Sequence, residues 1–356
     1  MRTELYDNVM GEPEVLSIVL DKRKEYFEAL GRKYAGVKRI YVVGSGTSYH
    51  AGLSVRRQME KLSGVEVVAS YPSVFMETQA LPEKDALCVG ISQSGRSAIT
   101  VRAIDRCRKL GYFTAGISSN NPSALTEAAE DYIPLVVGVE HSASTKGYVT
   151  SMLSLILLSM EIGLSNGHID AAVEQEVVSA FEAHVRNFPV LARKSEEWVA
   201  RNEEDMLKAV RISVLGYEGN YGTALEGALK LLETIRVMVA GYDFEEWLHG
   251  AYNALTPESY LFICRSASRF DYKERVGKLE EIVRPFTEHV FVIGADDESN
   301  PRNLCAPFSG NEYVLPLEYI IPYQMMIALL PQKKGINADR VLIPNFHTAV
   351  GSKSVR

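Results

Sequence analysis

The stretch Arg39-Ile40-Tyr41-Val42-Val43-Gly44-Ser45-Gly46-Thr47-Ser48 places a short apolar run directly before a turn rich in glycine and hydroxyl groups. A helical pattern follows from Ser48 to Leu62. A continuous apolar run bounded by glycine is typical of a strand buried on both faces. The stretch therefore predicts a buried parallel strand, a tight turn and a helix in succession.

The same alternation continues along the first half of the chain. Apolar runs cover Val65–Ala69, Ala86–Ile91 and Phe113–Ile117, and helical patterns such as Ala98–Lys109 separate them. An amphipathic segment at Val15–Leu30 precedes the first run and predicts a helix. Strands that alternate with amphipathic helices indicate a parallel sheet covered by helices on both faces.

The plan then repeats in the second half. An apolar run ends at Gly216, which follows Gly44 by 216 − 44 = 172 positions. At the same offset Tyr221 corresponds to Tyr49, and the run Tyr260–Cys264 corresponds to the run Ala86–Ile91. Three matches in order indicate an internal duplication.

The duplication predicts an α/β protein with two doubly wound, flavodoxin-like parallel sheets in tandem. We expect an N-terminal helical segment at 1–30, a first domain at 31–167, a charged helical connector at 168–205, a second domain at 206–335 and a C-terminal tail at 336–356 that closes the active site. The length allows each domain its own core.

Composition argues against several classes of protein. The net charge is −7, and acidic and basic residues are mixed along the chain without a basic stripe for a nucleic-acid backbone. The N-terminus lacks the apolar core of a signal peptide. The most apolar run, Met152–Met160, is shorter than the ~20 residues of a membrane span and predicts a buried helix. We expect a cytoplasmic protein with no nucleic-acid or membrane partner.

The four cysteines show no spacing typical of a metal site. Cys88, Cys107, Cys264 and Cys305 lie far apart, without a CxxC pair or a suitably spaced histidine. We therefore expect reduced thiols, no metal and no cofactor.

A second polar loop, Ser92-Gln93-Ser94-Gly95-Arg96-Ser97, also joins an apolar run to a helix. Because ligands of open α/β sheets bind at the carboxyl ends of strands, both this loop and 44–48 are candidate phosphate sites. Their hydroxyl and amide groups can surround a phosphate without a lysine. The alternative is that serine and glycine simply cap the helices, which is their commoner use.

Two further interpretations of these loops stay open. A dinucleotide site would want glycine where Tyr49 stands, although Glu66 could imitate the ribose-binding acid. A third polar segment, 141–147, precedes the buried helix and is either a ligand-binding segment or an N-cap with a surface lysine.

Three stretches carry a resemblance to a known family. Gly46-Thr47-Ser48, Ser92-Gln93-Ser94-Gly95 and Ser144-Thr145-Lys146 resemble, in this order, the isomerase half of glucosamine-6-phosphate synthases, which consists of sugar isomerase (SIS) domains. The resemblance extends from about residue 5 to the end of the chain.

The second half resembles the same family through Ala224–Leu231, Glu233 and His249-Gly250. The resemblance implies that Glu233 is the base that moves a proton between C1 and C2 and that His249 opens the sugar ring. It places Lys230 beside Glu233, and it implies that Lys353 contacts the open-chain sugar or forms a Schiff base.

The resemblance also implies a binding site and a partner. Phosphate and sugar contacts would come from Gly46, Thr47, Ser48, Ser92, Gln93, Ser94, Ser97, Ser142 and Ser144. The histidine commonly reaches the site of a neighbouring subunit in this family, so a homodimer with shared active sites is implied.

The chain departs from the family pattern at four places. It has no glutamine-hydrolysing domain, its tail is longer, Arg96 stands where an acidic residue is usual, and Phe244–Trp247 differs. The longer tail leaves the role of Lys353 open and makes His347 a candidate substrate contact.

Chemistry on a sugar phosphate beside a carbonyl group needs a carboxylate base and a second acid or base, and Glu233 and His249 are of those types. The resemblance implies an enzyme that acts on an amino-sugar or fructosamine 6-phosphate by aldose-ketose isomerisation with deamination or deglycation.

Three alternatives remain open. One is a non-catalytic phosphosugar-binding regulatory protein, and another is an isomerase or epimerase without nitrogen chemistry. From the residues alone, Glu226, Lys230 and Glu233 could also be a solvated helix face, and His249 a helix-end residue.

Overall fold

The computed structural model describes residues 3–77, 84–140, 143–266 and 271–353. The chain divides into two compact units. Unit 1 comprises Met1–Pro13, His141–Thr145 and Ala183–Arg340, and unit 2 comprises Glu14–Glu140, Lys146–Glu182 and Val341–Arg356. Each unit contains one five-stranded sheet.

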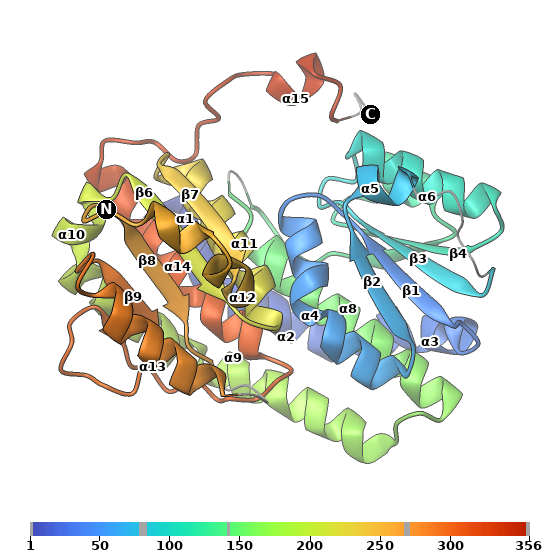
Figure 1. The fold of residues 1–356 in the computed structure, drawn as a ribbon. Helices are drawn as coiled ribbons and strands as arrows, with labels where there is room; N and C mark the ends of the chain where they lie inside the picture. Colours follow the sequence, from blue (N-terminus) through green and yellow to red (C-terminus); the bar gives the residue numbers. More distant parts are fainter. Residues whose placement is uncertain (1–2, 78–83, 141–142, 267–270, 354–356) are drawn as a thin grey trace. The chain divides into compact units, whose positions relative to one another are not determined.

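Unit 2 is built on a parallel sheet with the order β2-β1-β3-β4-β5 (Figure 1). Its strands are β1 (Arg39–Val43), β2 (Glu66–Ser70), β3 (Ala86–Ile91), β4 (Phe113–Ser118) and β5 (Asp131–Pro134). Its helices are α2 (Glu12–Asp21), the π-helix η1 (Lys24–Glu28), α3 (Ala29–Tyr34), α4 (Thr47–Ser63), α5 (Pro72–Glu77), α6 (Ala98–Lys109), α7 (Ala124–Ala128), α8 (Lys146–Asn166) and α15 (Phe346–Ala349). Helix α2 begins at two residues that belong to unit 1.

Unit 1 is built on a second parallel sheet with the order β10-β9-β8-β6-β7 (Figure 1). Its strands are β6 (Arg211–Gly216), β7 (Met238–Asp243), β8 (Tyr260–Cys264), β9 (Val290–Ile293) and β10 (Asn303–Leu304). Its helices are α1 (Glu4–Met10), α10 (Glu203–Lys208), α11 (Gly219–Thr234), α12 (Phe244–Leu248), the 3₁₀ helix η2 (Ala251–Ala254), α13 (Tyr272–Val283) and α14 (Leu315–Lys333). The long helix α9 (Ala171–Arg201) starts in unit 2 and ends in unit 1.

The two sheets have the same topology and register. Counted within each unit, both run second, first, third, fourth, fifth strand, which is the flavodoxin-like order. Arg39 pairs with Glu66, and Arg211 pairs with Met238. The offsets are 211 − 39 = 172 and 238 − 66 = 172, so the strand pairs repeat in register. The structure therefore confirms the predicted tandem α/β fold and the internal duplication.

Apolar helices form much of each core. Helix α8 is buried from Gly147 to Gly163, which confirms the buried helix predicted at Met152–Met160. In length and composition α8 alone among the described helices could cross a membrane, yet 94% of its apolar window is buried inside the structure. It packs against α4 as a core helix, and in unit 1 the apolar helix α14 packs against α11.

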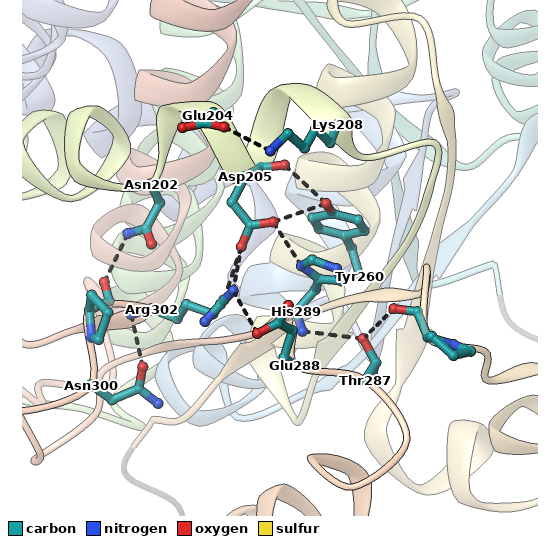
Figure 2. Close-up of polar contacts among 12 residues, drawn as sticks. Asn202, Glu204, Asp205, Lys208, Tyr260, Thr287, Glu288, His289, Asn300 and Arg302 are labelled. Atoms are coloured by element: carbon teal, nitrogen blue, oxygen red, sulfur yellow. Dashed lines mark hydrogen bonds and ion pairs between the residues drawn. The ribbon is translucent and has the colours of Figure 1, made fainter.

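A polar cluster lies at the amino ends of the strands in the unit 1 sheet (Figure 2). Asp205 on α10 accepts a hydrogen bond from the Tyr260 hydroxyl at 3.0 Å and from Arg302 Nε at 3.0 Å. His289 Nδ1 lies 2.7 Å from Asp205 Oδ1, and the His289 ring stacks on Tyr260 with centroids 4.1 Å apart. Because Tyr260 starts β8 and His289 directly precedes β9, one carboxylate ties these strand ends to α10.

Candidate functional site

The switch point of the unit 2 sheet lies between β1 and β3, where strand order reverses. Loops 44–48 and 92–97 leave the carboxyl ends of these two strands and are here named the first and second hydroxyl loops. The two loops that the sequence predicts as phosphate sites therefore flank the usual ligand position of this fold.

The first hydroxyl loop forms a tight turn into α4. The Ser48 N–H donates to the Ser45 carbonyl at 3.3 Å, and Gly46 has φ 55° and ψ −129°. These angles are those of the first central residue of a type II′ turn, where glycine is favoured. Thr47 and Ser48 are partly exposed in the first turn of α4, where helix amides favour an anion.

The second hydroxyl loop leaves two hydroxyl hydrogens able to donate to a ligand. Ser92 Oγ accepts the Ser97 N–H at 3.3 Å, and Ser97 Oγ accepts the Thr100 hydroxyl at 3.0 Å. Since both oxygens act as acceptors in these contacts, their own hydrogens remain for an external acceptor. Ser94 is partly exposed in the same loop.

Glu140 is a residue of this region that sequence reasoning missed. Gln93 Nε2 donates to Glu140 Oε2 at 2.9 Å. The same carboxylate accepts the N–H groups of Lys146 at 2.7 Å and Gly147 at 3.2 Å, and so caps the start of α8. The acidic residue shortly before a long helix was the available signal for a cap. The Gln93 amide is therefore oriented by Glu140.

The C-terminal tail meets the second hydroxyl loop within unit 2. Ser97 and Lys353 form an antiparallel β-bridge, and the Ala98 N–H donates to the Ser352 carbonyl at 3.1 Å. His347 is exposed, and its Nδ1 lies 2.9 Å from Ser352 Oγ. Partial burial and the nearby Lys353 charge lower the pKa of His347. The structure thus brings both predicted tail residues close to the loop.

The predicted sugar-site serines cannot be added to this group. Ser144 is partly exposed and belongs to unit 1. Ser142 lies outside the described residues.

Unit 1 carries a charged triad on α11. Lys230 is buried, and its Nζ lies 2.8 Å from Glu233 Oε2 and 3.5 Å from Glu226 Oε1. Burial disfavours its charge, but the two carboxylates outweigh burial and raise the pKa of Lys230. The Glu226 side chain is 1% exposed, whereas that of Glu233 is 43% exposed. The triad is therefore no solvated helix face, and it presents a single carboxylate at the surface.

His249 lies at the C-terminal end of α12. Its Nδ1 is 2.8 Å from the Glu245 carbonyl oxygen. Because a carbonyl only accepts, Nδ1 carries the hydrogen, and Nε2 of the neutral ring keeps a lone pair. Within the described part of the chain, no hydrogen bond or ion pair joins His249 to Glu233.

The described residues contain no group of three or more histidine, cysteine, aspartate or glutamate side chains placed to hold a metal. All four cysteines are free thiols, and Cys88, Cys107 and Cys264 are buried.

A domain model and two solved structures are similar to this chain. The SIS domain model matches residues 33–160. A Clostridium difficile 630 structure with the provisional name phosphosugar isomerase is 31% identical, covers 100% of both chains and has a TM-score of 0.93. A Salmonella typhimurium LT2 structure provisionally named a sugar binding protein is 33% identical, with a TM-score of 0.82, over 91% of this chain and 99% of that one.

A curated relative connects the chain to a larger enzyme. The glutamine-fructose-6-phosphate aminotransferase (isomerizing) of Brucella abortus biovar 1 (strain 9-941) is 26% identical over 352 residues, which cover 96% of this chain and 57% of the relative. The chain thus spans little more than half the length of that relative. Together these matches show that the chain belongs to the SIS domain family and is homologous to phosphosugar isomerases and to the isomerase domain of glutamine-fructose-6-phosphate aminotransferases.

Proposed function

We propose that the protein is a cytoplasmic enzyme that binds an amino-sugar or fructosamine 6-phosphate and catalyses aldose-ketose isomerisation with deamination or deglycation. The observation that carries this proposal is the triad on α11. Buried Lys230 holds the exposed carboxylate of Glu233 at 2.8 Å, while the other carboxylate, Glu226, is buried. An exposed carboxylate fixed by a buried cation is suited to be the base that removes the proton beside a carbonyl or iminium group.

Lys230 then has an electrostatic role. Its neighbouring carboxylates raise its pKa despite burial, so it stays an ammonium group at neutral pH. A charged ammonium cannot attack a carbonyl, which makes Lys230 unsuited to form a Schiff base. It orients Glu233 and offsets the negative charge that develops on the sugar oxygen.

His249 is the second acid or base. With Nδ1 bonded to the Glu245 carbonyl, Nε2 is the ring nitrogen left to take the proton of the sugar hydroxyl during ring opening. The family resemblance supports a homodimer in which this residue serves the neighbouring subunit's site. Light scattering of the purified protein tests that assembly.

The hydroxyl loops of unit 2 are proposed to bind the phosphate. The hydroxyl hydrogens of Ser92 and Ser97 are able to donate to a phosphate. Thr47, Ser48 and Ser94 add further hydroxyl donors. None of these five residues is acidic, so none of them repels an anion. Proposed sugar contacts are Ser142 and Ser144, with Lys353 and His347 from the tail.

The test is turnover on a panel of glucosamine 6-phosphate, galactosamine 6-phosphate, fructose 6-phosphate and fructosamine 6-phosphate adducts, followed by release of ammonia or amine. We expect one nitrogen-containing substrate to turn over and Glu233→Gln to lower kcat by about 10³-fold or more. The control is Glu281→Gln, which changes an exposed carboxylate on α13 of the same unit and should leave kcat unchanged.

A specific finding favours one second candidate, a non-catalytic phosphosugar-binding protein. The Salmonella relative, 33% identical, is named for sugar binding alone. Saturable binding of several sugar phosphates without turnover of any would favour this candidate and assign Glu233 and His249 structural roles.

A further inference from the structure

We propose that the segment 118–123, which starts at the last residue of β4, is a positioning element for the second hydroxyl loop, with Ser119 and Asn120 as its positioning residues. Named here the clamp loop, it acts by holding the backbone carbonyls of the hydroxyl loop away from the bound phosphate. The inference rests on the phosphate binding proposed above.

The Gln93 carbonyl is saturated by the clamp loop. It accepts the Ser119 N–H at 2.9 Å, the Ser119 hydroxyl at 2.7 Å and the Ser118 hydroxyl at 3.2 Å. A carbonyl oxygen has two lone pairs, so three donors use its full capacity. This carbonyl cannot turn toward a ligand while the contacts last.

The next two carbonyls are held from the same side. The Ser94 carbonyl accepts Asn120 Nδ2 at 3.2 Å, and the Gly95 carbonyl accepts the N–H of Leu125, in the first turn of α7, at 2.9 Å. Gly95 itself lies against Ser123, because a Cβ added at Gly95 would lie 2.1 Å from Ser123 Oγ. Three successive carbonyls of the hydroxyl loop therefore face the segment that follows β4.

This arrangement matters for an anion because of the direction of the peptide dipoles. A phosphate is held by N–H and O–H groups, and a carbonyl oxygen turned toward it would repel it. Rotation of one peptide unit in a glycine-containing loop would exchange a donor for an acceptor at the site. Side-chain donors on the clamp loop oppose that rotation at Gln93 and Ser94.

The binding test measures the Kd of fructose 6-phosphate and of inorganic phosphate by calorimetry. Ser119→Ala and Asn120→Ala should each weaken both ligands by about 5- to 10-fold, as expected for loss of one hydrogen bond. In turnover the same loss should appear in KM and not in kcat. Ser119→Thr keeps the hydroxyl and should restore wild-type affinity.

The control for a merely structural role is Thr126→Ala. Thr126 shares a capping box with Ser123 at the start of α7 but gives no hydrogen bond to the hydroxyl loop. It should lower the melting temperature without changing either Kd. If Ser119→Ala and Asn120→Ala bind both ligands like the wild type, the positioning role is wrong while phosphate binding stands. If the wild type binds neither ligand, both proposals fail.

Discussion

The loops after β1 and after β6 have the same backbone but different chemistry. Gly46 has φ 55° and ψ −129°, and Glu218, at 218 − 46 = 172, has φ 52° and ψ −126°. Each is followed by the same turn, since the Ser48 N–H donates to Ser45 and the Asn220 N–H donates to Tyr217. Duplication thus preserved a type II′ turn even where a glutamate must adopt angles that favour glycine.

The difference in side chains separates the roles of the two sheets. The loop after β1 offers hydroxyl groups and suits an anion. The loop after β6 offers Tyr217 and Glu218 instead. Burial, followed by the negative charges of Glu218, Glu245 and Asp243, raises the pKa of Tyr217. Such an acidic surrounding is unfavourable for a dianion. A shared backbone frame therefore does not imply a shared ligand.

The largest effect is expected when the glutamate of the loop after β6 is placed at the equivalent position of the loop after β1. Gly46→Glu places a carboxylate beside the proposed phosphate and adds strain at φ 55°. Calorimetry should show at least about 100-fold weaker binding of fructose 6-phosphate. Gly46→Ala carries strain without charge and should lose much less affinity. Equal losses in the two variants would contradict the electrostatic part of the comparison.

The core helices provide a second comparison, because each contains a buried glutamate. Glu161 on α8 pairs with Lys24 at 2.8 Å, whereas Glu318 Oε1 on α14 has no partner among the described residues. Burial raises the pKa of Glu318 to about 7, although the Ser309 N–H opposes this shift.

A raised carboxyl pKa means that the folded state binds the proton more tightly than the unfolded state. Its stabilising contribution is present below the ordinary value of 4.5 and is lost as the pH rises through 7. Relative to wild type, Glu318→Gln should gain about 2.5 kcal/mol in the free energy of unfolding between pH 5 and pH 8. The free energy of unfolding is measured with urea at each pH for the wild type and for Glu318→Gln. If the two proteins show the same dependence on pH, Glu318 does not have a raised pKa.

The amino ends of the strands in the unit 1 sheet contrast with the strained loop after β6 at the carboxyl ends. The polar groups at the amino ends are paired. Asp205→Ala leaves Tyr260, His289 and Arg302 without their common acceptor (Figure 2). Urea unfolding should show a loss of about 2 kcal/mol, with unchanged affinity for fructose 6-phosphate. Neighbouring Glu204→Ala breaks only an exposed pair with Lys208 and should have little effect. A matching loss in both variants would deny the cluster a special role.

The smallest effect is expected at Glu218. Glu218→Gly relieves the backbone strain, while the added freedom of glycine in the unfolded chain offsets part of the gain. The free energy of unfolding should rise by about 1 kcal/mol, measured by thermal melting at neutral pH. A loss of stability would mean that the contacts of Glu218 outweigh the strain.

The sequence predicts the fold well because the deciding signals are local. Apolar runs bounded by turns match six strands of the structure to within one residue, and the 172-residue offset recurs in the strand register. The angles of Glu218 could not be predicted, since a type II′ turn favours glycine there.

The candidate site is predicted less completely because its supporting contacts are distant in sequence. The hydroxyl loops follow from glycine and serine at strand ends. Their supports, Glu140 on Gln93 and Ser119 on the Gln93 carbonyl, come from residues 47 and 26 positions away. Periodicity carries no information on such pairs, and only the folded sheet brings them together.

The exchange of the proton beside the carbonyl carbon for deuterium tests Glu233 as the base most directly, at C2 of an aldose phosphate or at C1 of a ketose phosphate, followed by NMR in D₂O with the wild type and Glu233→Gln. If Glu233 is the base, the wild type exchanges this proton in the substrate found in the panel, and Glu233→Gln loses the exchange while it still binds the sugar phosphate. Exchange that continues at the wild-type rate in Glu233→Gln, or its absence in a wild type that binds the ligand, would contradict Glu233 as the base.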